Sequence, residues 1–256
     1  MFVDDEGRPV ATPDRVRRVV SIVPSLTEAV ALSDRALLVG ATDWCTHPSD
    51  LDVVRVRGTK NPDVAAIVAL APDLVVANQE ENRPDDLDAL RAAGVPVYVT
   101  DIRTLDGAVD GAFGALARML AACGITRLGW LDDAERAWAA VPEPTWRRRA
   151  VVPIWRRPWM AVGRDTFTGA VLARLGVDNA LCNDLERYPR FDPEALPAHD
   201  LVVLPDEPYN FTTEDGPESF PGVQSVLVSG RLLTWYGPSL LEARALGDVA
   251  GDPSTA

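Results

Sequence analysis

The fold is decided by the stretch GTKNPDVAAIVALAPDLVVAN, residues 58–78. The run 64–70 contains no helix breaker and predicts a short helix, which the Pro-Asp pair at 72–73 ends. The next four residues, 74–77, are LVVA, and a continuous apolar run of this kind is typical of a strand that is buried on both faces. A helix that leads directly into a buried strand is the repeating unit of an α/β protein with a parallel sheet.

The same alternation continues on both sides of this stretch. The further elements predicted in this half are strands over 19–23, 37–41 and 95–99 and a helix over 85–93. Ser25 and Glu28 have the spacing of a capping box, which predicts a helix start after the first strand. Loops that follow the carboxyl ends of parallel strands usually hold the ligand. We therefore expect a parallel sheet with helices on both faces and a ligand site in these loops.

A longer helical segment interrupts the alternation after residue 104. Apolar residues recur at helical spacing without a proline, which predicts a helix over 105–122, and a second helix is predicted over 128–140. The later elements are strands over 150–155, 201–204 and 226–228 and a helix over 166–175. The chain is therefore expected to comprise an N-terminal α/β lobe over 18–104, a bridging helix and a connecting helix over 105–145, and a C-terminal α/β lobe over 146–245.

Composition excludes several classes of protein. The 256 residues include 25 basic and 38 acidic side chains, and a net charge of -13 repels nucleic acid. No apolar run is long enough for a membrane span. Three widely spaced cysteines predict neither a disulfide framework nor a CxxC zinc site. The first residues lack a signal-peptide pattern, so we expect a cytoplasmic monomer, or an extracytoplasmic protein if the true N-terminus is missing.

Several motifs together resemble a known family. In the N-terminal half these are VVSIVPSLTE, VGATDWCTHP, the stretch 58–78 and VPVYVT, and later segments such as VGRDTFTGAVLARLGVDNAL and LLTWYGPSL extend the likeness over residues 18–245. They resemble the substrate-binding proteins that deliver vitamin B12 and iron siderophores to ABC importers, also called helical-backbone metal receptors. The resemblance implies two Rossmann-like lobes bridged by one long helix, a ligand cleft between them, a corrinoid or iron-siderophore-type ligand, and an ABC permease as partner.

The resemblance also draws attention to two loops. The vitamin B12 binders of this family are expected to carry a tryptophan where this chain has Thr59-Lys60-Asn61, and another where it has Asn78-Gln79. These aromatic platforms are absent here.

The candidate ligand contacts are polar and aromatic residues that follow predicted strand ends. They are Trp44, His47, Lys60, Asn61, Glu80, Arg103, Arg187, Glu207, Tyr209, Trp235 and Tyr236. Lys60 is the one lysine beside 24 arginines, and an ammonium is a compact point charge that arginine does not reproduce. Trp235 and Tyr236 precede Gly237-Pro238, a loop that is expected to display its rings to a flat ligand.

Two other clusters have alternative interpretations. Cys45 and His47 could serve as a catalytic dyad or as metal ligands, although Pro48 favours a turn over the strand that would align them. The acidic pairs Glu80-Glu81 and Asp206-Glu207 could hold a cation, but bonding to arginines or capping of turns is the favoured role. The sequence assigns no metal ligands and no catalytic residue.

Three functions fit these observations. The leading hypothesis is a ligand-binding protein that acts in the cytosol on a metal-containing or planar polar ligand. The alternative is an enzyme on the same two-lobe scaffold, in which Lys60, His47, Glu207 or Tyr236 supplies acid-base groups. The third is a regulatory protein whose acidic surface contacts a basic partner.

Overall fold

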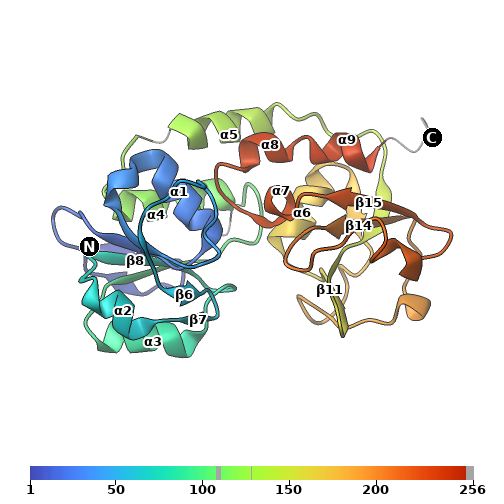
Figure 1. Ribbon diagram of the computed structural model, residues 1–256. Helices are drawn as coiled ribbons and strands as arrows, with labels where there is room; N and C mark the ends of the chain where they lie inside the picture. Colours follow the sequence, from blue (N-terminus) through green and yellow to red (C-terminus); the bar gives the residue numbers. More distant parts are fainter. Residues whose placement is uncertain (108–110, 128, 252–256) are drawn as a thin grey trace. The chain divides into compact units, whose positions relative to one another are not determined.

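The computed structural model describes residues 1–107, 111–127 and 129–251 and divides into two compact units (Figure 1). Unit 1 comprises Met1–Ile102, Asp106–Glu135 and Tyr236–Pro238. Unit 2 comprises Arg103–Leu105, Arg136–Trp235 and the residues from Ser239 onward. Each unit has its own parallel sheet and its own helices, so the predicted α/β class is confirmed.

Unit 1 contains a five-stranded sheet. Its strands, in spatial order, are β5 (Val54–Arg55), β4 (Leu38–Ala41), β3 (Val19–Ser21), β8 (Leu74–Asn78) and β9 (Val97–Thr100). All four pairings are parallel. Every residue of β3, β8 and β9 is buried, as the apolar runs predicted.

Helices cover both faces of this sheet. They are α1 (Pro24–Asp34), α2 (Val64–Ala69), α3 (Pro84–Ala92) and α4 (Ala112–Ala122). Figure 1 shows α2 and α3 on one side of the sheet and α1 and α4 on the other. Asp63 caps α2 by accepting the N–H of Ala66 at 3.0 Å, and Ile67 of that helix joins the core formed with Val75 and Val97.

Two predicted helix starts are wrong. The predicted capping box of Ser25 and Glu28 is absent because α1 begins with Pro24, and its N-cap Val23 makes no side-chain cap bond. Proline suits the first turn of a helix, because the backbone N–H groups of that turn have no acceptor within the helix and proline has no N–H to satisfy. The helix predicted to start at Leu105 starts at Ala112, with Gly111 as N-cap, while residues 108–110 lie outside the described residues.

Unit 2 contains a four-stranded parallel sheet. Its order is β13 (Val177–Asn179), β10 (Arg148–Val151), β14 (Leu201–Pro205) and β15 (Gln224–Val228). An antiparallel hairpin of β11 (Pro153–Arg156) and β12 (Trp159–Ala161) follows β10. The helices of this unit are α6 (Phe167–Arg174), α7 (Gly230–Thr234), α8 (Leu240–Ala243) and α9 (Leu246–Ala250).

The chain passes between the units within α5 (Gly129–Ala139). In the first half of α5, the indole N–H of Trp130 donates to Ser33 of α1 at 2.8 Å. In the second half, the indole N–H of buried Trp138 donates to the carbonyl of Leu240 at 2.9 Å. Residue 128 lies outside the described residues. One of the points at which the chain passes between the units lies within α5, whereas α4 belongs to unit 1. The bridging helix and the lobe bounds stay predictions.

An N-terminal hairpin completes unit 1. Its strands are β1 (Phe2–Val3) and β2 (Pro9–Val10), which pair antiparallel. The Asp5 carboxylate accepts from the Arg118 guanidinium of α4 at 2.8 Å and from the N–H of Asp101 at 3.1 Å. These bonds hold the hairpin against the edge of the sheet beside β9. Within the described residues, no helix is both long and apolar enough to cross a membrane.

Candidate functional site

The strand order of unit 1 indicates where a ligand would bind. β3 is the first strand of the sheet along the chain, and β4 and β5 extend from it in one direction while β8 and β9 extend in the other. Ligands of open α/β sheets bind outside the carboxyl ends of the strands where the order reverses. In unit 1 that point lies between β3 and β8. The loops that meet there include residues 59–61 and 79–83, where several of the candidates lie.

A buried network of amide side chains joins these loops. Asn82 accepts from the N–H of Asn78 at 2.9 Å, and its amide donates to the carbonyls of Ile22 at 3.2 Å and Thr59 at 3.0 Å. Asn78 donates to the carbonyl and the hydroxyl of Thr100 at 3.0 and 3.1 Å. Asn78 and Asn82 are 1% and 3% exposed. These hydrogen bonds satisfy the buried amide side chains and hold the ends of β3, β8 and β9 together.

Trp44 is exposed to solvent near these loops. It lies in a turn after β4, and its ring is 67% exposed. A Cβ at Gly58 would lie 2.4 Å from Asn61 Oδ1 and 3.4 Å from the Trp44 indole nitrogen. Gly58 lies in a small hairpin of β6 (Arg57–Gly58) and β7 (Asn61–Pro62). Its missing side chain lets the side chains of Asn61 and Trp44 lie close to the backbone of β6. The exposure of Trp44 leaves part of its flat indole surface open to a ligand.

Lys60 lies at the tip of the same hairpin and reaches the loop after β8. Its ammonium donates to the carbonyl of Glu80 at 2.5 Å. Burial raises the pKa of the half-buried Glu81 carboxyl, and the charge of Lys60 lowers it by less. Trp44, Lys60, Asn61 and Glu80, four of the predicted contacts, are therefore neighbours at one edge of unit 1. A flat aromatic face, an ammonium and an amide lie together there.

The raised pKa of Glu81 leads to a prediction about stability. Its folded-state pKa lies above the ordinary value of 4.5, so this group favours folding below that pH and costs stability as the pH rises through the folded-state pKa. Glutamine carries no charge to desolvate. We expect Glu81→Gln to be more stable than the wild type at pH 7, with the difference shrinking toward pH 4.5.

Urea unfolding at a series of pH values would measure this difference. Glu186→Gln, at an exposed glutamate of unit 2, is the matched control and should follow the wild type at every pH. A difference for Glu81→Gln that stays constant with pH would contradict the burial of its charge.

Cys45 and His47 do not form a dyad. Cys45 is fully buried, and its thiol lies 3.0 Å from the Thr27 hydroxyl and 3.1 Å from that of Thr42. Burial raises the pKa of this thiol, with the threonine hydroxyls lowering it by less, so the nucleophilic thiolate is disfavoured. The exposed His47 ring instead contacts the Thr46 hydroxyl at 3.1 Å. As Pro48 predicted, the run after β4 is a turn and not a strand.

The prediction that Trp235 and Tyr236 display their rings is wrong. Trp235 is 9% exposed and Tyr236 is 6% exposed. The Arg231 guanidinium of α7 lies 5.9 Å from the centre of the Trp235 ring, a cation–π distance within unit 2. In unit 1, a Cβ at Gly237 would lie 2.9 Å from the carbonyl of Ser25, so the segment 236–238 packs closely on the start of α1. Packing accounts for both rings.

The sheet of unit 2 has its own reversal of strand order, between β10 and β14. Trp155, in the hairpin after β10, is 43% exposed, and its ring meets that of Tyr209 edge to face at 5.7 Å. The Tyr209 hydroxyl donates to Asp215 at 2.7 Å. Arg156 forms ion pairs with Asp215 and Glu218. The exposed aromatic surface at this edge of unit 2 is therefore Trp155, held by Tyr209.

The remaining candidates have structural contacts. Arg187 donates to the carbonyl of Asp165 at 3.0 Å. Asp206 accepts the N–H of Gly230, the first residue of α7, at 2.6 Å. Glu207 is half-buried against Gly230, where a Cβ would lie 2.3 Å from its Cγ. Arg103, half-buried, follows β9 and is counted with unit 2. A ligand role for Arg103, Arg187 and Glu207 stays a prediction.

Sequence reasoning missed the buried amides. Asn78 was considered only as the place of a missing tryptophan, but together with Asn82 it connects three strand ends. A usable signal was the position of Asn78 at the end of an apolar strand, where its side chain accepts the N–H of Glu80 at 2.9 Å. Within residues 1–107, 111–127 and 129–251, no group of three or more His, Cys, Asp or Glu side chains could hold a metal ion.

Comparisons with known proteins agree with this architecture. No family model matches the sequence. A vitamin B12-binding protein of Vibrio cholerae is 31% identical over 105 residues, which are 40% of this chain and 37% of that protein. An uncharacterized ABC transporter substrate-binding lipoprotein of Bacillus subtilis is 31% identical over 103 residues, 38% of this chain and 32% of that protein. These matches span less than half the length of either relative.

A solved structure matches far more of the chain. The periplasmic heme-binding protein of Roseiflexus sp., in its apo form, superimposes with a TM-score of 0.72 and 21% identity over 92% of this chain and 99% of that one. The predicted resemblance to substrate-binding proteins for vitamin B12 and iron siderophores is confirmed, and so is the α/β fold with two parallel sheets. The names of the lipoprotein and the periplasmic protein place those relatives outside the cytoplasm, so the predicted cytosolic location has no support from them.

Proposed function

We propose that this chain, a relative of vitamin B12-binding and other ABC transporter substrate-binding proteins, binds a large planar ligand that contains a metal and carries acidic groups. The observation that carries the proposal is the carboxyl edge of unit 1. There the exposed Trp44 indole lies beside Lys60 and Asn61, where the strand order reverses. A flat indole suits a conjugated ring system, and an ammonium suits a carboxylate at its rim.

The two loops that should bear tryptophans in the vitamin B12 binders refine the ligand class. One of them carries Lys60 here, and the other begins with Asn78, which is buried and bonded to Thr100. Neither loop offers a second aromatic platform, and one offers a cation. This composition favours a ligand with acidic groups, such as an iron chelate or a porphyrin, over cobalamin itself.

We further propose that the protein delivers this ligand to an ABC permease outside the cytoplasm. The support is the resemblance to relatives named as a substrate-binding lipoprotein and as a periplasmic binding protein. Fractionation of the native host would test the location: recovery with the membrane or the extracytoplasmic fraction is expected, and recovery with cytosolic markers would contradict it. Deletion of a neighbouring permease gene should abolish uptake of the ligand.

The enzyme alternative finds less support at this edge. The buried Cys45 is bonded to two threonines, and Lys60 is bonded to a main-chain carbonyl. Neither arrangement activates a nucleophile. Binding without turnover is the simpler account of these residues.

Calorimetric titration with three probes would test the ligand class. Hemin, cyanocobalamin and a ferric catecholate siderophore differ in planarity and charge. We expect hemin or the ferric siderophore to bind with a defined stoichiometry and more tightly than cyanocobalamin. Tightest binding by cyanocobalamin would contradict the acidic-ligand proposal, and no binding by any of the three would contradict the proposed function as a whole.

Lys60 provides a second prediction. Lys60→Met keeps an unbranched side chain, shorter by one atom, but removes its charge, and we expect about tenfold weaker binding of an acidic probe, the usual cost of one charge-assisted hydrogen bond. The affinity for a neutral ligand should not change. Arg57→Met, which removes an exposed cation from the same hairpin, is the control in the same titration. An equal loss in both variants would indicate general electrostatic attraction rather than a contact at Lys60.

A further inference from the structure

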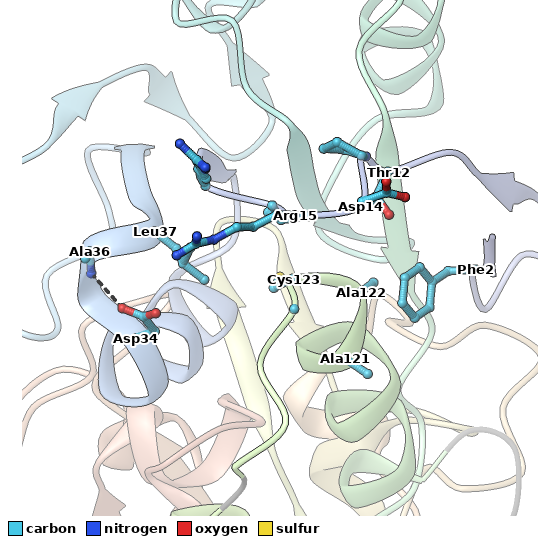
Figure 2. A pocket seen from close by; sticks show the side chains of 14 residues that line it. Phe2, Thr12, Asp14, Arg15, Asp34, Ala36, Leu37, Ala121, Ala122 and Cys123 are labelled. Carbon is cyan, nitrogen blue, oxygen red and sulfur yellow. Dashed lines mark hydrogen bonds between the residues drawn. The ribbon is translucent and has the colours of Figure 1, made fainter.

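Unit 1 has a pocket at the opposite edge of its sheet from the candidate ligand site. Its volume is about 500 Å³, within the range of small-molecule sites. It is lined by the segment 12–17, which leads into β3, by residues 34, 36 and 37 at the end of α1, and by residues 121–124 at the end of α4 (Figure 2). The amino ends of β3 and β4 follow directly, so this pocket is separate from the carboxyl edge.

The lining of this pocket combines apolar walls with charges of both signs. Val16, Leu37 and the alanines that end α4 supply the apolar surface. Arg15 and Arg17 carry guanidinium groups, and Asp14 and Asp34 carry carboxylates, so the formal charges balance. Burial raises the pKa of the Cys123 thiol to about 12, which leaves this wall uncharged at neutral pH. A simple anion would be repelled by the two carboxylates, and a simple cation would be repelled by the two guanidinium groups.

Hydrogen bonds fix the backbone of the segment 12–17 without engaging the side chains of Arg15 and Arg17. Asp73 accepts the N–H groups of Arg17 and Arg18 at 2.7 and 3.0 Å, which fixes the backbone of the segment 12–17. Arg18 turns away and donates to the carbonyl of Leu70 at 2.6 Å. Within the described part of the chain, Arg15 and Arg17 form no ion pair. Figure 2 shows Arg15 directed toward the turn that carries Asp34 and Leu37.

The opposite wall favours a positive group. Asp34 accepts the N–H of Ala36 at 3.2 Å, which orients its carboxylate at the end of α1. The last residues of α4, Ala121 and Ala122, also line the pocket, and the C-terminal end of a helix carries partial negative charge. We propose that this pocket binds a small zwitterion of the amino-acid class, with its carboxylate on Arg15 and Arg17 and its ammonium toward Asp34 and the end of α4. An apolar side chain of the ligand would contact Val16 and Leu37.

Three probes that share one hydrocarbon chain separate the charge requirements. Norleucine has both charged groups, hexanoate lacks the ammonium, and pentylamine lacks the carboxylate. Amide signals of the full chain, followed by two-dimensional NMR, should shift in a saturable way for residues 12–17, 34–37 and 121–124. Norleucine is expected to bind at least about tenfold more tightly than hexanoate or pentylamine, because each of these two probes lacks one charge-assisted contact.

Variants locate the contact. Arg15→Ala removes an exposed side chain. It should weaken the binding of norleucine about tenfold without changing the melting temperature of the protein. Arg190→Ala, at an exposed arginine of unit 2, makes the same change of charge elsewhere and should bind like the wild type. Equal binding of all three probes, equal binding by Arg15→Ala and the wild type, or shifts confined to other residues would each overturn the proposal. Because hemin and siderophore titrations report on the other edge, their outcome does not affect this test.

Discussion

Replacing Asn82 with alanine is expected to lower the free energy of unfolding by about 3 kcal/mol or more, since an unsatisfied buried polar group costs roughly 1–3 kcal/mol. The side chain satisfies three main-chain groups at once: the N–H of Asn78 and the carbonyls of Ile22 and Thr59. All three lie beneath the loops of the candidate site. Alanine would leave them without partners in a place where water does not reach easily.

The measurement is urea unfolding at neutral pH, followed by circular dichroism. Asn210→Ala, at an exposed asparagine of unit 2, is the matched control and should change stability by less than about 0.5 kcal/mol. Asn82→Asp keeps an acceptor for the N–H of Asn78 but turns a carboxylate oxygen toward two carbonyls, so it should also be destabilised. If Asn82→Ala were as stable as the control, the buried network would not be what holds the three strand ends together.

The central strands of unit 1 and most of its helices could be predicted because local sequence encodes them, whereas β1, β2, β5, β6 and β7 were not predicted. The run LVVA at 74–77 became β8, which ends one residue later at Asn78, and the Pro-Asp pair marked the end of α2 correctly. The wrong start of α1 has a local cause as well. Pro24 was available as a first-turn signal, and it outweighs the spacing of Ser25 and Glu28.

The contacts at strand ends could not be predicted in the same way. The partners of Asn82 come from residues 22, 59 and 78, which are up to 60 positions away in sequence. The parallel pairing of β3 with β8 and the position of the β6–β7 hairpin bring them together. The same limit applies to Trp235, whose burial depends on tertiary packing and on Arg231 of α7. Aromatic residues in a loop before proline predicted a display of rings, but exposure is decided by tertiary packing.

This contrast between the tryptophans can be tested directly. Trp44→Ala is expected to weaken the binding of hemin or of the ferric siderophore by about 5- to 150-fold, the range for one lost stacking face by analogy with base–aromatic stacking. Because Trp44 is 67% exposed and lies in the turn after β4, its loss should leave the free energy of unfolding nearly unchanged. Trp44→Phe, which retains a smaller flat face, should recover part of the affinity.

Trp235→Ala should behave in the opposite way. Its ring is buried and lies against Arg231, and truncation of a buried tryptophan costs about 3–5 kcal/mol of stability. Any decrease in the apparent affinity of Trp235→Ala for the probe should then be proportional to the fraction of the protein that remains folded. Calorimetry and urea unfolding on the same preparations separate the two effects. If Trp44→Ala bound every probe like the wild type while Trp235→Ala lost affinity at unchanged stability, the ligand contact would belong to the segment 235–236, and the edge between β3 and β8 would have to be abandoned as the site.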